Sequence, residues 1–173
     1  MRVINVPPAA LVLLIGPAGA GKSTFAARHF SADAIVSSDR LRKLAAGDDS
    51  NQQANDDVFG RIHQVVAERA GAGLLTVIDA TNTRGPQRTE LGWHAHRYHR
   101  PLVAIVLDLP LEICLARNGS RPHPVPARVV RQQSADLRHL DTDLEAEGYA
   151  AVHSFRSVSE LETAQVWIGD RMA

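Results

Sequence analysis

The sequence GPAGAGKS occupies positions 16–23, as Gly16-Pro17-Ala18-Gly19-Ala20-Gly21-Lys22-Ser23, and Thr24 follows it directly. Its spacing fits the pattern G-x-x-x-x-G-K-[S/T], in which the amides of a glycine-rich loop wrap around phosphate groups. Residues 10–15 are all apolar and predict a buried strand before the loop, while residues 23–30 are compatible with a helix after it. The alternative is a glycine-rich turn that fits the pattern by chance, and it is disfavoured because a predicted strand and helix flank the loop. The segment therefore predicts a site for the phosphates of a nucleoside triphosphate.

The residues of this loop have separate chemical tasks. Glycines allow the backbone to approach phosphate oxygens, so that successive amides and the helix N-terminus face the anion. The ammonium group of Lys22 is expected near the β- and γ-phosphates, and the Ser23 hydroxyl is expected to bind Mg²⁺. Residues 16–24 are thus predicted to hold ATP, or another nucleoside triphosphate, together with Mg²⁺.

Bulk composition favours an ordinary globular protein. The chain has 173 residues, of which 45% are hydrophobic and 22% charged, and we expect a single domain over residues 1–173. No apolar run approaches the roughly 18 residues of a membrane span, and no signal-peptide cleavage site follows the N-terminus. Cys114 has no second cysteine to pair with. These features predict a cytoplasmic protein without a membrane partner.

Apolar runs and helical periodicities alternate along the chain. Strands are predicted at residues 34–37, 74–79, 102–108 and 150–155, in addition to the strand at 10–15. Between and after them, helices are predicted at residues 38–44, 58–70, 86–98, 111–117, 127–139 and 157–171, with loops at 47–57 and 118–126. This alternation predicts an α/β fold of the P-loop NTPase type, similar to nucleoside kinases, with a mostly parallel sheet covered on both faces by helices. Ligands of such sheets bind at the carboxyl ends of the strands, where the loop, Asp39 and residues 79–82 should meet.

Three sequence blocks carry a family resemblance. They are residues 16–26, the sequence Val36-Ser37-Ser38-Asp39, and the sequence Val77-Ile78-Asp79-Ala80-Thr81-Asn82. An arginine-rich segment at about 117–138 matches as well, with Arg121 four residues after Arg117. In these blocks and their spacing the chain resembles the kinase domain of bacterial polynucleotide kinase/phosphatase enzymes, among the AAA-type small P-loop kinases. It is more loosely similar to the phage 5′-polynucleotide kinases.

The resemblance implies roles for individual residues. Asp39 would be the general base for the attacking hydroxyl, although Ser38-Asp39 is also a suitable helix cap. Arg42, one turn later, would steady an acceptor phosphate or else be a solvated surface side chain. Asp79 would hold a water of Mg²⁺ or support the phosphate loop, and Asn82 would contact the substrate.

Arg117 and Arg121 resemble the arginines of a lid that closes over the triphosphate and stabilises charge in the transition state. An exposed pair of arginines is the alternative. Where the polynucleotide kinases carry a further basic residue, this chain has His123-Pro124-Val125-Pro126, which leaves the hold on the acceptor less defined. Those enzymes also continue into further modules.

Three functions remain to be compared. The first is an ATP-dependent kinase of 5′-hydroxyl ends of DNA or RNA in nucleic-acid repair, and the second is a kinase of a small molecule such as a nucleoside, sugar or antibiotic. The third, a regulatory ATPase, is disfavoured because an Asn-Lys-x-Asp motif and an Asp-Glu pair after a buried strand are both missing. Acidic residues at 48–49 and 56–57 oppose a polyanion, whereas the family resemblance favours a polynucleotide.

Overall fold

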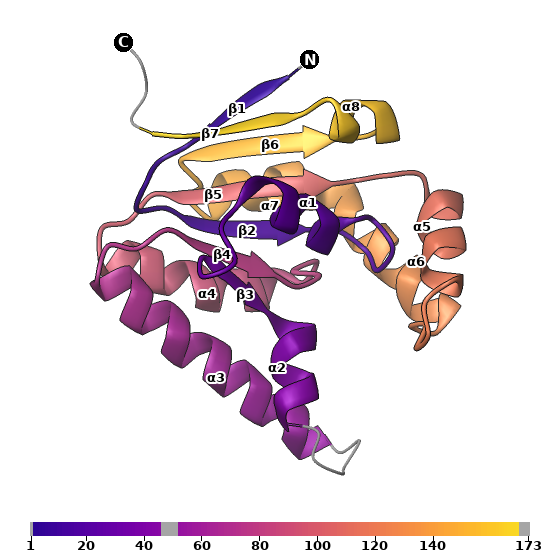
Figure 1. The fold of residues 1–173 in the computed structure, drawn as a ribbon, viewed down its shortest axis with the longest axis horizontal. Coiled ribbons are helices and arrows are strands. Elements are labelled where there is room, and N and C mark those ends of the chain that lie inside the picture. The colour runs from indigo at the N-terminus through magenta and orange to yellow at the C-terminus, as the bar shows by residue number, and fades with distance from the viewer. Residues whose placement is uncertain (1, 46–51, 170–173) are drawn as a thin grey trace.

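A parallel sheet forms the centre of the protein (Figure 1), in a computed structural model that describes residues 2–45 and 52–169. Within those ranges its strands lie in the order β3-β4-β2-β5-β6, and every neighbouring pair is parallel. Their bounds are β2 Leu11–Ile15, β3 Ile35–Ser37, β4 Thr76–Asp79, β5 Leu102–Leu107 and β6 Ala151–Phe155. All five strands lie within the segments predicted from the sequence, which confirms the α/β fold class.

Alternate residues of the central strands face opposite sides of the sheet. Val12 and Leu14 of β2 belong to one apolar cluster, while Leu11, Leu13 and Ile15 belong to the other. Both faces are therefore buried, which explains why β2 and β5 are apolar at every position rather than at every second one.

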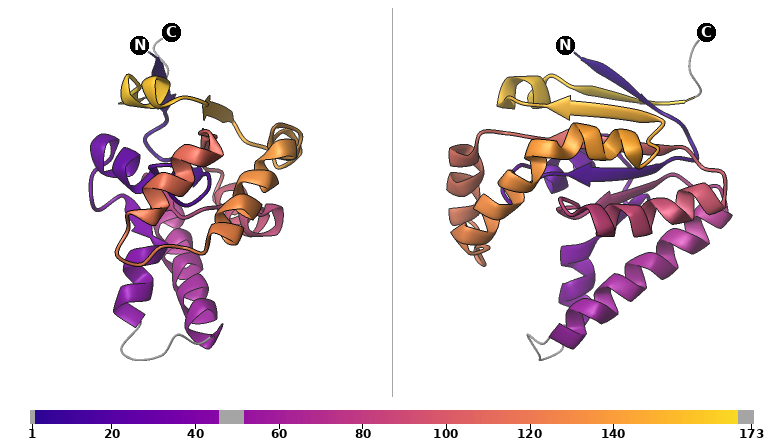
Figure 2. Two further views of the ribbon diagram at one scale, coloured as in Figure 1. Left: turned by 90° about the vertical axis from the view of Figure 1, so that its right-hand side faces the viewer. Right: turned by 180° about the vertical axis from the view of Figure 1, so that it is seen from behind.

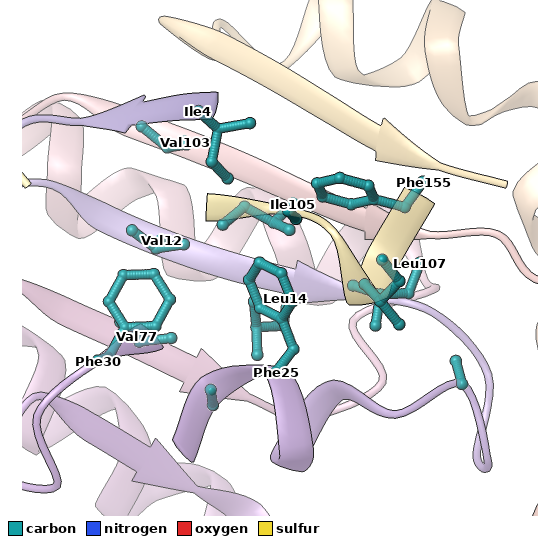
Figure 3. Packing of buried hydrophobic residues seen from close by; sticks show 14 of the residues in the cluster. Ile4, Val12, Leu14, Phe25, Phe30, Val77, Val103, Ile105, Leu107 and Phe155 are labelled. Atoms are coloured by element: carbon teal, nitrogen blue, oxygen red, sulfur yellow. The ribbon is translucent and has the colours of Figure 1, made fainter. Parts of the chain in front are cut away.

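Helices cover each face of the sheet (Figure 2). The first face is covered by α1 Lys22–His29 and α8 Val158–Glu162, and α5 Leu111–Gly119 packs on the same cluster from beyond the carboxyl ends of the strands. Figure 3 shows Phe25 and Phe30 packed near Val12, Leu14 and Val77. The second face is covered by α3 Gln52–Gly71, α4 Gly85–Arg97 and α7 Leu140–Ala146, with the turn η1 Leu137–His139. Two further helices, α2 Ser38–Ala45 and α6 Ala127–Asp136, stand at the carboxyl ends of the strands.

The C-terminal region differs from the prediction. Ser157 caps α8 as expected, since its hydroxyl accepts a hydrogen bond from the Glu160 amide at 3.2 Å. The predicted helix at 157–171 is wrong beyond Glu162, because strand β7 Gln165–Ile168 follows it. β7 pairs in parallel with β1 Val3–Val6, a strand that was not predicted. A capping box indicates where a helix starts and contains no information about its end.

Two smaller differences concern helices. α3 begins at Gln52, inside the loop predicted at 47–57, and α7 lies in a region for which no helix was predicted. Asp48 and Asp49 lie outside the described residues, and the single domain over residues 1–173 stays a prediction. In residues 2–45 and 52–169 no helix combines the length and the apolar character that crossing a membrane requires.

Candidate active site

The phosphate loop joins β2 to α1 and is anchored by its own backbone. The Gly16 amide donates to the Thr81 carbonyl at 2.9 Å, which ties the loop to the turn after β4. Gly19 adopts a φ of 85°, and a Cβ there would collide with the Cys114 carbonyl oxygen of α5. Gly21 caps α1 with a φ of 96°. Glycine is therefore required at both positions, which brings the loop against α5 and leaves its amides toward the sheet edge.

Lys22 is buried beneath this loop. Its Nζ donates to the carbonyl oxygens of Gly16 and Pro17, each at 2.8 Å, and only 8% of the residue is exposed. Burial lowers the pKa of Lys22 from 10.5 to about 8, although the negative charge of Asp79 acts in the opposite direction. Lys22 is therefore a cation at neutral pH whose charge is held inside the loop.

A single cleft of about 1460 Å³ opens at the carboxyl ends of the strands. Residues 18, 19 and 21–24 of the phosphate loop line it, whereas Gly16, Pro17 and Ala20 form the supporting part of the loop. The other predicted site residues that line the cleft are Asp39, Arg42, Asp79, Asn82, Arg117 and Arg121. Apart from Gly16, Pro17 and Ala20, all the predicted site residues therefore line the same cleft.

Asp39 lies in the first turn of α2 and contacts two arginines, Arg42 on the same helix and Arg121 from the segment after α5. Its Oδ1 accepts from Arg42 Nη1 at 3.0 Å, and its Oδ2 accepts from Arg121 Nη2 at 3.2 Å. The side chains of all three residues are substantially exposed, so each pair contributes at most about 1 kcal/mol. Arg121 therefore links α2 to the segment after α5 by a contact that a stronger anion can replace.

Arg117 and Arg121 flank the phosphate loop from the end of α5. The Arg117 guanidinium is 3.6 Å from the position of a Cβ at Gly21, and the segment that follows is closed by Asn118. Asn118 is buried, donates to the Val125 carbonyl at 2.8 Å and accepts from the Val125 amide at 3.1 Å. This clamp fixes both ends of the loop that carries Arg121. The closing of residues 117–138 as a lid over the triphosphate stays a prediction.

Asp79 and Ser23 fit the predicted magnesium site chemically. Ser23 is exposed at the start of α1, and Asp79 ends β4 with 7% of its surface exposed. Within the described chain no three His, Cys, Asp or Glu side chains form a group that could hold a metal ion. Mg²⁺ in phosphate sites takes one or two protein oxygens besides phosphate and water, so a hydroxyl with a nearby carboxylate suits it. The assignment of Mg²⁺ to Ser23 and Asp79 stays a prediction.

Asn82 has a clear structural role at the edge of the cleft. It is buried with a φ of 48°, and its Nδ2 donates to the Leu14 carbonyl at 2.8 Å, next to the start of the phosphate loop. Its predicted contact with the substrate is not tested by these bonds. Arg88 of α4 stabilises the same turn, because its Nη1 donates to the carbonyls of Asn82 and Thr83 at 3.2 and 2.9 Å.

Several cleft residues were missed by the sequence analysis. Gln133 of α6 accepts a hydrogen bond from the Ala18 amide at 2.9 Å, although the two residues are 115 positions apart. The cations Arg28, Lys43 and Arg84 also line the cleft. Their only sequence signal was an isolated charge on a helix or turn, which does not distinguish a cleft from a solvated surface.

The cleft is strongly basic although the chain is neutral overall. Its lining includes the cations Lys22, Arg28, Arg42, Lys43, Arg84, Arg117 and Arg121. The acids along the same lining are Asp39, Asp79 and Glu162. Since the formal net charge of the chain is +0, positive charge has been concentrated where phosphate groups are expected.

Solved structures with a similar fold include kinases. The Pnkp1/Rnl/Hen1 RNA repair complex matches with a TM-score of 0.62 and 23% identity over 77% of this chain and 45% of that one. A sugar kinase from Janibacter sp. HTCC2649 matches with a TM-score of 0.57 and 22% identity over 86% of both chains. The APS kinase CysC of Mycobacterium tuberculosis, in complex with AMPPNP and APS, has a TM-score of 0.51 and 18% identity over 81% of this chain and 99% of that one.

These identities establish a shared fold. The chain spans less than half the length of the protein that it matches in the RNA repair complex. No curated protein sequence matches the chain. A family described as an AAA domain matches residues 11–140, which include the phosphate loop, Asp39, Asp79, Arg117 and Arg121. The chain therefore belongs to the AAA domain family, and its fold is that of the P-loop kinases, which are phosphotransferases.

Proposed function

We propose that this protein is an ATP-dependent kinase that transfers the γ-phosphate of ATP to the 5′-hydroxyl end of a polynucleotide. The observation that carries this proposal is the cleft in which the phosphate loop, the Asp39 carboxylate, Arg117 at the end of α5 and Arg121 just after it meet. Phosphoryl transfer requires these parts together, because it depends on positioning and on stabilising charge more than on covalent help from the protein. A cytoplasmic location, where ATP is supplied, is part of the proposal.

On the donor side, the amides of residues 19 and 21–24 hold the triphosphate, and Lys22 supplies a positive charge beneath it. Arg117 and Arg121 then contact the phosphates from the opposite side of the loop. Ser23, and Asp79 through a water molecule, would hold Mg²⁺, which would supply neutralisation of charge on the phosphate oxygens.

On the acceptor side, Asp39 orients the hydroxyl in line with the γ-phosphorus and accepts its proton. The hydroxyl oxygen forms a bond to the γ-phosphorus while the bond from that phosphorus to the β–γ bridging oxygen breaks. ADP leaves with the bridging oxygen, and the acceptor becomes a phosphomonoester. Arg42, next to Asp39, is placed to hold an acceptor phosphate, and Asn82 borders the same space.

The polynucleotide acceptor is supported by the resemblance of the sequence blocks and by the basic lining of the cleft. Of the acidic residues that oppose this acceptor, Asp57 is exposed on α3 and does not line the cleft. A small-molecule acceptor is the second candidate. It is favoured by the matches to a sugar kinase and to an APS kinase, which extend over most of both chains. Hydrolysis alone, as in a regulatory ATPase, is the third.

One experiment separates these functions. The protein is incubated with Mg²⁺ and ATP labelled in the γ-phosphate, together with 5′-hydroxyl oligonucleotides of DNA or RNA, or with a panel of nucleosides, sugars and antibiotics. We expect label on the 5′ ends of oligonucleotides, and Lys22→Ala to abolish it. Label only on small molecules would overturn the polynucleotide acceptor, and label only in free phosphate would indicate a regulatory ATPase.

A further inference from the structure

Gln133 makes the one side-chain contact to a phosphate-loop amide found in residues 2–45 and 52–169. Its Oε1 accepts the Ala18 N–H at 2.9 Å, and the residue is partly buried along the cleft wall. Gln133 lies on α6, a helix that directly follows the segment carrying Arg121. The contact joins the loop to an element that is remote in sequence.

This hydrogen bond completes a set that fixes the first half of the loop. The Gly16 amide is bound by the Thr81 carbonyl, and the Ala20 amide is bound by the Pro17 carbonyl at 3.2 Å. Pro17 has no N–H to donate. Ala18 lies between these points, and no backbone carbonyl of the described chain reaches its amide, so the Gln133 side chain supplies the acceptor. The remaining loop amides lie closer to α1, next to the N-terminus of the helix, which is the positive end of its dipole.

We propose that Gln133 is a positioning residue for triphosphate binding: it anchors Ala18 so that the phosphate loop keeps the shape that presents its other amides to the phosphates. This proposal rests on the proposed function, since it assumes that the loop binds a triphosphate. It extends that function by assigning part of the affinity for the donor to α6.

The same helix also contacts the turn after β4. Gln132 Nε2 donates to Asp136 Oδ1 at 2.8 Å, and Thr83 Oγ1 donates to Asp136 Oδ2 at 3.4 Å. α6 thus touches the donor loop through Gln133 and the turn beside Asn82 through Asp136. Gln132 is exposed and does not line the cleft, which makes it a matched control for its neighbour.

The test compares Gln133→Met with Gln132→Met in the full chain. Methionine is unbranched and similar in length to glutamine but cannot accept the bond from Ala18. We expect exchange of the Ala18 amide, measured by NMR, to become at least about tenfold faster in Gln133→Met. We expect the Kd for ATP with Mg²⁺, measured by calorimetry, to rise about fivefold. Gln132→Met should match the wild type in both measurements.

A second variant keeps the acceptor but changes its charge. In Gln133→Glu the carboxylate still accepts from Ala18, so exchange should stay slow, while ATP binding weakens by about tenfold because a negative charge now faces the phosphates. This variant also serves if Gln133→Met does not fold. The proposal is overturned if exchange at Ala18 is unchanged in Gln133→Met, or if it accelerates without a change in the Kd. Exchange at Ala18 as fast in Gln133→Glu as in the unfolded chain would also overturn it.

The two proposals fail in different ways. A wild-type protein that does not bind ATP would overturn the proposed function and the binding half of this inference together. If the wild type and Gln133→Met bind ATP equally tightly, the kinase proposal stands and only the role of Gln133 is removed.

Discussion

Asp39 illustrates how a reactive group is kept in place by weak contacts. Both of its oxygens are bound by arginines, yet these pairs are exposed and each is worth little in stability. A triphosphate has more negative charge than a single carboxylate and would draw Arg121 away at small cost. Asp39 would then be left with Arg42 as its neighbour and with an oxygen available to an acceptor hydroxyl.

The role of Asp39 predicts a selective loss of catalysis. Asp39→Asn keeps the shape of the side chain but removes its ability to accept a proton, so we expect the transfer rate to fall at least about 100-fold. The Kd for ATP should change by less than about threefold, because the donor site is built by the loop. Single-turnover kinetics and calorimetry measure the two quantities. Asp33→Asn, at an exposed carboxylate that does not line the cleft, is the control. Normal turnover in a folded Asp39→Asn protein would exclude it as the base.

Lys22 predicts a pH dependence of stability. The pKa of its amine is 10.5 in the unfolded chain and about 8 in the folded protein. Between these values the unfolded state binds more protons, so the free energy of unfolding rises with pH. The lowering corresponds to about 3 kcal/mol, and it reflects the cost of keeping the charged group buried at neutral pH.

The measurement compares wild type with Lys22→Met in urea at several pH values. The unfolding free energy of the wild type should rise relative to that of the variant, by about 2 kcal/mol from about pH 7.5 to about pH 10. The other titrating groups are common to the two proteins, and those that do not interact with Lys22 cancel in the difference. A difference that stays constant with pH would show that Lys22 titrates normally.

Among the elements, α4 and α7 hold the turn that borders the acceptor side of the cleft. The fully buried Arg88 forms a bidentate pair with Glu147, with Nη2–Oε1 at 2.7 Å and Nε–Oε2 at 2.9 Å. Its third nitrogen supports the carbonyls of Asn82 and Thr83. The buried Arg88–Glu147 pair therefore holds in place the turn at Asn82 and Thr83.

Removing this arginine should therefore affect both stability and the cleft. Arg88→Met leaves Glu147 without its partner and should lower the free energy of unfolding by about 3–5 kcal/mol. Urea unfolding measures the loss, and Arg97→Met, at an exposed cation of the same helix, should change it by less than about 1 kcal/mol. Replacing Glu147 by Leu in the Arg88→Met background should recover part of the loss, because the uncompensated charge is gone. Equal stability of Arg88→Met and Arg97→Met would contradict this account.

At the scale of the whole molecule, positive and negative charges balance, but the cations are concentrated along the cleft. The balanced total gives no general attraction to polyanions, while the cleft concentrates cations over its donor and acceptor parts. Specific attraction is thus confined to the place where the chemistry is proposed to occur.

This distribution predicts a salt dependence that identifies the acceptor. If an oligonucleotide binds through several phosphates, its KM should rise by at least about tenfold between about 50 and about 200 mM salt. An uncharged sugar acceptor should show less than about a twofold change over the same range. Arg84→Gln should reduce the slope for the oligonucleotide, and Arg138→Gln, which does not line the cleft, should leave it unchanged. A slope near zero for the preferred acceptor would favour the small-molecule candidate.

The α/β architecture and the donor site could be predicted from the sequence because their signals are local. Residues 16–23 combine glycine spacing, a lysine and a hydroxyl in one turn, and the apolar runs mark buried parallel strands wherever they stand. Asp79 is the last residue of a strand, and Asp39 and Asn82 come two and three residues after strands end. The topology of a parallel sheet therefore brings them to the same edge before any side chain is positioned.

Tertiary structure decided the features that depend on pairing between distant segments. β1 and β7 contain few residues each and become strands because they pair with one another across the length of the chain, which a local pattern does not encode. Gln133 reaches Ala18, and Arg121 reaches Asp39, only after helices have packed on the sheet. The reason is physical: the hydrophobic period of a segment is written in its own residues, whereas the partner of a polar side chain is set by which distant groups the folded core brings within hydrogen-bonding distance.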